Sequence, residues 1–160
     1  MSSKRIDHLF FNFNSILRTS DLVNISNPCV GAQNFPTYLP AKCFLEAVAF
    51  ELAIKIYFEI DNNKEAPHTH NLGEIFPKLS ETTRKDIENF FAQEVVVKAK
   101  LMENVIGKKL YIPEFKEAIS NNSEMVMNFK YRPVLPNGSL INLGFLYKIY
   151  RNLENRLKNK

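Results

Sequence analysis

The chain has no tryptophan, only two cysteines and five glycines, and no apolar run near the roughly 20 residues that span a membrane. Residues 1–14 contain neither an uninterrupted apolar stretch nor a small-residue cleavage site, so we expect no signal peptide. Cys29 and Cys43 form no CxxC pair, and we interpret them as reduced thiols. These absences argue against a membrane protein or a disulfide-stabilised secreted domain, and they predict a cytoplasmic protein.

Length and composition predict one globular domain spanning 1–160, with 45% apolar and 24% charged residues. Thirteen phenylalanines and six tyrosines predict a core built largely from aromatic side chains. The net charge of +4 equals that of residues 148–160, a basic C-terminal tail with five cations and one anion. We favour a solvated tail; in the alternative, Lys148 and Arg151 contact nucleic-acid phosphates.

The stretch 40–61 is the element around which we expect the rest to pack. It has no glycine and no internal proline, and it is rich in Leu, Ala, Glu and Lys, which favours a helix. Between Cys43 and Ile60 it carries four charged residues, and most of its circumference is apolar. Such a helix is normally buried on most sides, so we expect it at the centre of a bundle.

The spacing of apolar residues in the rest of the chain also predicts helices. We therefore expect an all-α fold, a helical bundle of four to five main helices with an irregular loop after the first helix. Apolar spacing and turn residues predict these segments in order: a helix over 4–18, a loop over 19–39, a short helix over 72–79 ended by Pro77, a helix from Thr82 or Thr83 to Gly107, a short helix after Pro113 ending at Asn121–Asn122, and a last helix over 143–157 capped by Asn142.

The sequence also predicts which residues of one helix are buried, and it leaves the structure of one segment open. The long helix before Gly107 is expected to turn one set of residues inward: Ile87, Phe90, Phe91, Glu94, Val97, Leu101 and Val105. Residues 125–132 alternate partly like a strand, but Ser123 and Glu124 could equally begin a short helix, and the sequence leaves both structures open.

The clearest candidate for chemistry is His68-Thr69-His70, because a His-x-His pair can hold a metal. The third histidine, His8, is distant, and no acidic or cysteine cluster has metal-ligand spacing, so we expect no metal and no other cofactor. The structural interpretation is that His70 helps to cap the following short helix while His68 is exposed. The functional one makes either histidine a general acid or base.

Glu51 and Lys55 are a second candidate, since they form an i,i+4 pair in the favoured order on an apolar helix. The pair either lines a polar pocket between helices or lies in an ordinary surface seam, and we favour the seam. We interpret Cys43, on the same helix, as a buried and unreactive thiol.

Residues 129–132 alternate aromatic and basic side chains, as single-stranded nucleic-acid binders do. Lys130, Tyr131 and Arg132 are therefore candidate nucleic-acid contacts, although an arginine beside a tyrosine also commonly anchors a turn. The chain has no glycine-rich phosphate loop, no GxSxG and no Ser/His/Asp arrangement readable from spacing.

Several of these segments together resemble the HEPN superfamily over about residues 41–153. The resemblance is carried by the central helix with Ala47, Glu51, Leu52 and Lys55, by His70-Asn71-Leu72 leading into Ile75-Phe76, by 129–132 and by the last helix from Leu143. It implies a compact all-α bundle that commonly forms a homodimer. It also implies RNA cleavage or RNA binding in defence or toxin–antitoxin biology, in some members beside a nucleotidyltransferase-like companion protein.

Active members of that superfamily carry an arginine followed, after four to six residues, by a histidine. No arginine of this chain has a histidine at that distance. Lys64 precedes His70 with five residues between, but a lysine lacks the planar guanidinium fork that binds phosphate.

The leading hypothesis is therefore a non-catalytic RNA-linked or defence-linked binding module. One alternative is a divergent metal-independent ribonuclease using His68 or His70 with Arg132 or Lys55. The other is a purely structural domain that binds a partner protein.

Overall fold

The computed structural model describes residues 3–26, 39–109, 112, 114–128 and 143–159, and all regular structure within them is helical. This confirms the all-α class. The helices are α1 (Ser3–Ser26), α2 (Leu39–Asn62), α3 (Leu72–Ile75) with the 3₁₀ turn η1 (Phe76–Lys78), α4 (Glu81–Phe91), the π-helical turn η2 (Ala92–Val96), α5 (Val97–Ile106), α6 (Phe115–Asn128) and α7 (Leu143–Lys158).

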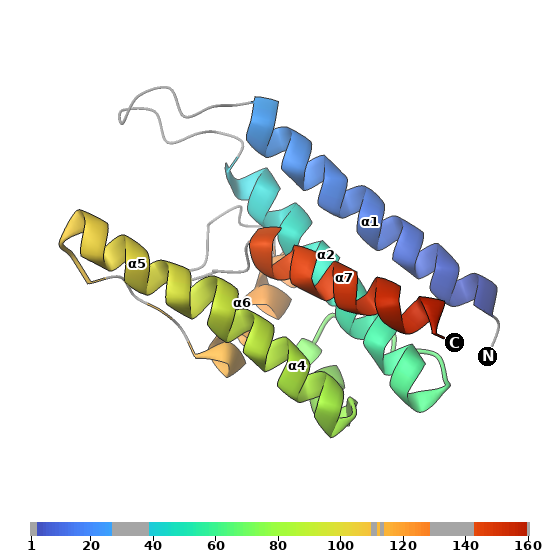
Figure 1. Ribbon diagram of the computed structural model, residues 1–160. Helices are drawn as coiled ribbons and strands as arrows, with labels where there is room; N and C mark the ends of the chain where they lie inside the picture. The colour runs from blue at the N-terminus through green and yellow to red at the C-terminus, as the bar shows by residue number, and fades with distance from the viewer. Residues whose placement is uncertain (1–2, 27–38, 110–111, 113, 129–142, 160) are drawn as a thin grey trace.

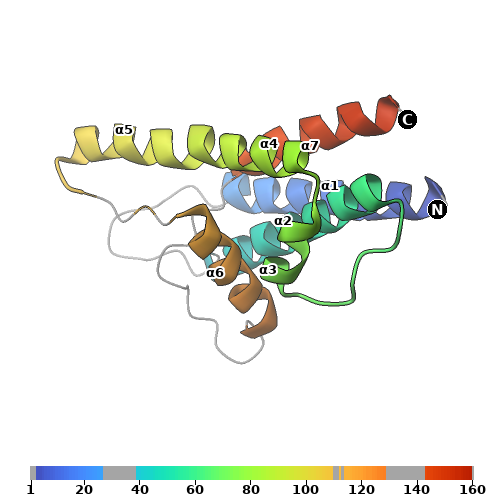
Figure 2. The same cartoon turned by 90° about the horizontal axis from the view of Figure 1, so that it is seen from below.

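Helix α2 is the central element, as predicted. It contacts α1, α3, α6 and α7. Helix α1 runs antiparallel beside it, α4 and α7 lie on one side of it, and α3 and α6 lie on the other (Figures 1 and 2). No helix within the described ranges is long and apolar enough to cross a membrane.

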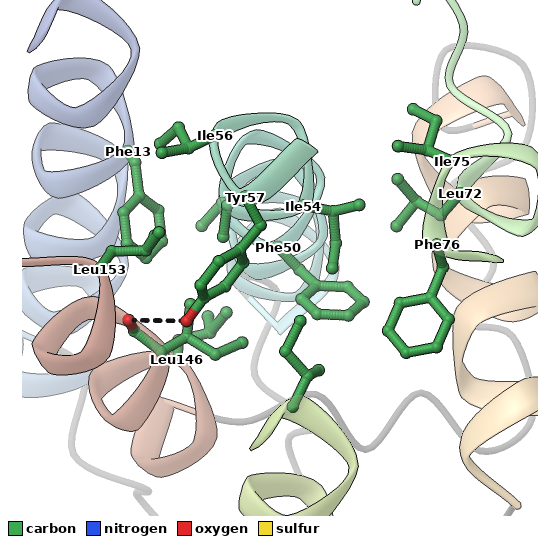
Figure 3. Close-up of a cluster of buried hydrophobic side chains, with 14 of the residues drawn as sticks. Phe13, Phe50, Ile54, Ile56, Tyr57, Leu72, Ile75, Phe76, Leu146 and Leu153 are labelled. Atoms are coloured by element: carbon green, nitrogen blue, oxygen red, sulfur yellow. Dashed lines mark hydrogen bonds between the residues drawn. The ribbon is translucent and has the colours of Figure 1, made fainter. Parts of the chain in front are cut away.

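The core consists of aromatic and branched side chains around α2, which confirms the expectation from composition. Phe50, Ile54 and Tyr57 of α2 are completely buried between Phe13 and Leu153 on one side and Leu72, Ile75 and Phe76 on the other (Figure 3). The Phe50 ring lies 5.4 Å from that of Phe145, between centroids, in a tilted arrangement. Aromatic pairs of this geometry add to the stabilisation from apolar burial.

Helix α1 is longer than predicted, because residues 19–26 continue it rather than forming a loop. Among the polar residues that suggested a loop, Asp21 has a partner elsewhere in the bundle. Ser20 is fully buried, and Asp21 accepts a hydrogen bond from the hydroxyl of Tyr147 in α7 at 3.1 Å. The rest of the predicted loop, 27–38, lies outside the described residues.

Helix α6 likewise continues past Asn121–Asn122, where the sequence predicted an end. Asn122 is fully buried and donates a side-chain hydrogen bond to the carbonyl of Ala47 in α2 at 3.2 Å, so tertiary packing overrides its turn preference. Residues 125–128, for which strand and helix were both open, are helical. Residues 129–132 and the predicted cap Asn142 are not described.

The segment from α4 to α5 begins at a different cap from the one predicted. Ile87 and Phe91 are buried as predicted, but after Phe91 the segment buries a different face. Ser80, not Thr82 or Thr83, is the N-cap, and its hydroxyl oxygen accepts from the Thr83 amide at 3.2 Å. Gly107 ends α5 in the left-handed conformation, as expected. Phe91, Val95 and Ala99 are buried, whereas Val97, Leu101 and Val105 are exposed. The reason is η2, because a π-helical turn adds a residue and shifts the buried face.

The basic C-terminal tail is part of α7 up to Lys158, and three of its cations make ion pairs. Lys148 pairs with Glu94 at 3.3 Å, Arg156 with Asp86 at 3.0 Å, and Lys158 with Glu154 at 3.2 Å. The favoured interpretation as a solvated tail is therefore wrong for Lys148 and Arg156, which the bundle holds, whereas Lys158 is largely exposed.

The shift of the buried face at η2 can be tested at two valines, one buried and one exposed, that lie two residues apart. Val95→Ala removes two buried methyl groups and should lower the free energy of unfolding by about 2 kcal/mol. Val97→Ala, at a side chain that is 51% exposed, should change it by less than about 0.5 kcal/mol. Urea unfolding followed by circular dichroism measures both. A larger cost at Val97 than at Val95 would show that the helix continues without the π turn.

Candidate functional site

Glu51, Lys55 and His70 meet on one side of α2, where the chain approaches α3. Glu51 Oε1 accepts a hydrogen bond from Lys55 Nζ at 2.7 Å, and both Glu51 oxygens lie 3.0 Å from His70 Nδ1. The Glu51 side chain is 6% exposed, that of Lys55 17% and that of His70 59%. The carboxylate is thus buried rather than in the surface seam that we favoured, and His70 joins the two residues that the sequence paired.

A short turn sets the position of His70. The Thr69 amide donates to the carbonyl of Pro67 at 2.9 Å, and the Thr69 hydroxyl accepts from the Asn71 amide at 3.0 Å. Asn71 is the N-cap of α3, and its side chain accepts from the Gly73 amide at 3.1 Å. The capping role considered for His70 therefore belongs to Asn71, and the imidazole bonds to Glu51.

This arrangement orients the imidazole. An ionised carboxylate only accepts hydrogen bonds, so its bond to the ring requires a proton on Nδ1. In the neutral ring Nε2 is then unprotonated and available at a largely exposed side chain. An imidazole held through one nitrogen with the other open to solvent can take up a proton, release one or contact an anion.

His68, the other histidine of the motif, lies in a different environment. Its side chain is 89% exposed, and its Nε2 is 3.3 Å from Glu65 Oε1. Glu65 is itself half exposed and also pairs with Arg5 at 2.8 Å. Ion pairs this exposed contribute little, so His68 is weakly held and His70 is the better-defined candidate.

The structure does not bring the nucleic-acid candidates of α7 to this site. Lys148 donates a hydrogen bond to Gln93 at 2.6 Å, and Arg151 is exposed. Figure 2 shows that α7 lies on the side of α2 opposite α3. The other candidates, Lys130, Tyr131 and Arg132, lie outside the described residues.

A second polar cluster, which the sequence did not reveal, joins α2, α4 and α7. The Tyr57 hydroxyl donates to Asn152 Oδ1 at 3.0 Å and points toward α7 in Figure 3. Arg156 donates to Thr83 at 2.7 Å and to Asp86 at 3.0 Å, and it lies over the Tyr57 ring. Burial raises the pKa of Tyr57, which keeps the phenol protonated. No spacing rule connects residues so far apart, and the cluster binds the helices to one another.

The other candidates for chemistry were a cysteine and a metal site. Cys43 is half-buried rather than fully buried as predicted. Its burial still raises the pKa of the thiol, which favours the thiol over the reactive thiolate and agrees with an unreactive side chain. Among the residues that the structure describes, no three His, Cys, Asp or Glu side chains are grouped so that they could hold a metal ion.

Comparisons of the chain with protein-family models, with curated proteins and with solved structures find no match. The functional interpretation therefore starts from the side chains of this site and from the resemblance stated above.

Proposed function

We propose that this chain is a cytoplasmic HEPN-like domain that acts as an RNA-linked binding module in defence or toxin–antitoxin biology, with His70 as its contact to the RNA backbone. The observation that carries the proposal is the hydrogen bond between the His70 ring and the buried Glu51 carboxylate. It directs the open edge of the imidazole outward, where a phosphate oxygen or a ribose 2′-hydroxyl can bond to it.

The ion pairs of α7 decide which of its candidate cations is available to RNA. Of the two α7 candidates, Lys148 already pairs with Glu94, whereas Arg151 is exposed. Because contacts to phosphates release counterions, RNA affinity should be strongest at low salt. The biological setting, a homodimer and a nucleotidyltransferase-like companion protein are parts of the proposal that rest on the resemblance.

The two histidines provide a matched test of RNA binding. Loss of one backbone contact costs about 1–2 kcal/mol, so His70→Ala should weaken the binding of labelled single-stranded RNA at low salt by about tenfold. His68→Ala removes a more exposed imidazole that no buried carboxylate holds, and it should leave the affinity unchanged. Fluorescence anisotropy measures both variants. Absence of RNA binding at low salt, or equal losses in the two variants, would contradict the proposal.

A second function, metal-independent RNA cleavage, is favoured by the same geometry. A carboxylate that orients a solvent-accessible imidazole is an arrangement suited to general acid–base catalysis. In this alternative His70 transfers the proton, Glu51 positions its ring, and Lys55 or Arg132 stabilises the phosphate charge.

The ribonuclease alternative predicts cleavage of a labelled RNA pool in the presence of a metal chelator. His70→Ala should reduce the rate by about 100-fold or more, which is the usual contribution of a general acid or base. Glu51→Gln should cause a smaller loss, and His68→Ala none, with the helical circular dichroism spectrum retained in all three. Intact RNA after prolonged incubation with the wild-type protein would exclude this alternative and leave the binding proposal standing.

A further inference from the structure

A cavity of about 940 Å³ lies on the side of the bundle formed by α3, η1 and α6, with one contribution from α4. We call it the α6 groove. Its apolar lining includes Phe76, Phe115, Ile119 and Met127. The rings of Phe76 and Phe115 meet edge to face with centroids 5.2 Å apart, so the lining is a packed aromatic surface rather than a set of loose side chains.

The groove follows α6 for most of its length. Its lining within α6 runs from Phe115 to Met127, and Ile119, Ser123 and Met127 recur every four residues along one helical face. Twelve helical steps correspond to about 18 Å, or three turns. In Figure 2 this helix lies beside α3 at the edge of the bundle. A three-turn apolar channel matches the stripe of an amphipathic helix better than it matches a compact ligand.

The charges around the α6 groove are predominantly negative. Among the described residues, Glu88 from α4, Glu114 just before α6 and Glu124 within it line the groove, and Lys116 is the one cation beside them. All three carboxylates are exposed, and none of them forms an ion pair in the described part of the chain. By contrast, Glu81 and Glu154 on the outer surfaces each pair with a lysine one turn away. The described part of the groove therefore offers net negative charge beside apolar surface.

The apolar channel is also open at one end. Met127 is 48% exposed, although Ile119 on the same face is 5% exposed and Ser123 is 4% exposed. The Ser123 hydroxyl accepts from the Leu72 amide and donates to the Ile119 carbonyl, both at 3.0 Å. The bond from Leu72 holds α6 against α3, and the bond to Ile119 lies within α6. The floor of the groove is therefore formed before an occupant binds, which lowers the cost of ordering it.

We propose that the α6 groove binds a basic amphipathic helix of about three turns from a partner protein. The apolar stripe of that helix packs on Phe76, Phe115 and Met127, and its flanking lysines or arginines approach the three free carboxylates. An acidic helix would place like charges opposite each other, so the groove selects by charge as well as by shape. This interaction surface does not depend on RNA binding by His70.

Two synthetic helical peptides of about fourteen residues test the proposal, one with leucines on one face and lysines elsewhere, the other with every lysine replaced by glutamate. The basic peptide should bind with chemical-shift changes confined to α3 and α6 in amide NMR spectra, and the acidic one should not bind. Met127→Glu, at a half-exposed position, should weaken the basic peptide by about tenfold or more while preserving the fold.

A charge reversal in the groove distinguishes specific recognition from nonspecific binding of a charged peptide. Replacing Glu88, Glu114 and Glu124 together by lysine should transfer the preference to the acidic peptide, and Glu81→Lys, outside the groove, should not. His70→Ala should bind the basic peptide like the wild type, which separates this inference from the RNA proposal. Equal binding of both peptides, binding insensitive to Met127→Glu, or a dimer that Met127→Glu dissociates in light scattering would overturn it.

Discussion

The fold depends on satisfying three carboxylates that one apolar helix carries into the core. Glu46, Glu51 and Glu59 of α2 are all at most 5% exposed, and a buried ionised group is costly unless it is paired. Glu46 binds Lys42 in its own helix at 2.6 Å, and burial nevertheless raises its pKa. The other two bind groups distant along the chain, so satisfying these charges also fixes how neighbouring segments lie against α2.

Glu59 and Glu51 show how this constraint produces a site. Glu59 Oε1 accepts from Arg5 of α1 at 3.0 Å and from the amide of Ala66 at 3.1 Å, which attaches both α1 and the connection after α2. Farther along the same connection, His70 lies within hydrogen-bonding distance of Glu51. The exposed imidazole is consequently positioned by a buried anion, whereas His68, two residues earlier, bonds to a half-exposed one. The buried carboxylate therefore marks His70, and not His68, as the candidate site residue of the His-x-His motif.

Sequence patterns predicted what depends on local periodicity and missed what depends on tertiary contacts. The apolar run at 40–61 predicted α2, and Gly107 predicted the end of α5. The patterns failed at residues 19–26, where Asp21 bonds to Tyr147 of α7, and at Asn121–Asn122, where the Asn122 amide bonds to Ala47 of α2. They also failed at Val97 and Leu101, where one π turn shifts the register. For the site, i,i+4 spacing predicted the Glu51–Lys55 pair. The bond to His70 could not be predicted, because it crosses a turn whose geometry is set by Thr69 and Asn71.

The most direct test of this account is the protonation pattern of the His70 ring. Long-range proton–nitrogen NMR spectra of the neutral imidazole distinguish a proton on Nδ1 from one on Nε2, and His68 in the same spectrum is an internal reference. The account predicts the Nδ1-protonated form at His70, and its loss in Glu51→Gln while His68 stays unchanged. An Nε2-protonated His70 in the wild-type protein, indifferent to Glu51→Gln, would contradict the claim that the buried carboxylate of α2 organises the site.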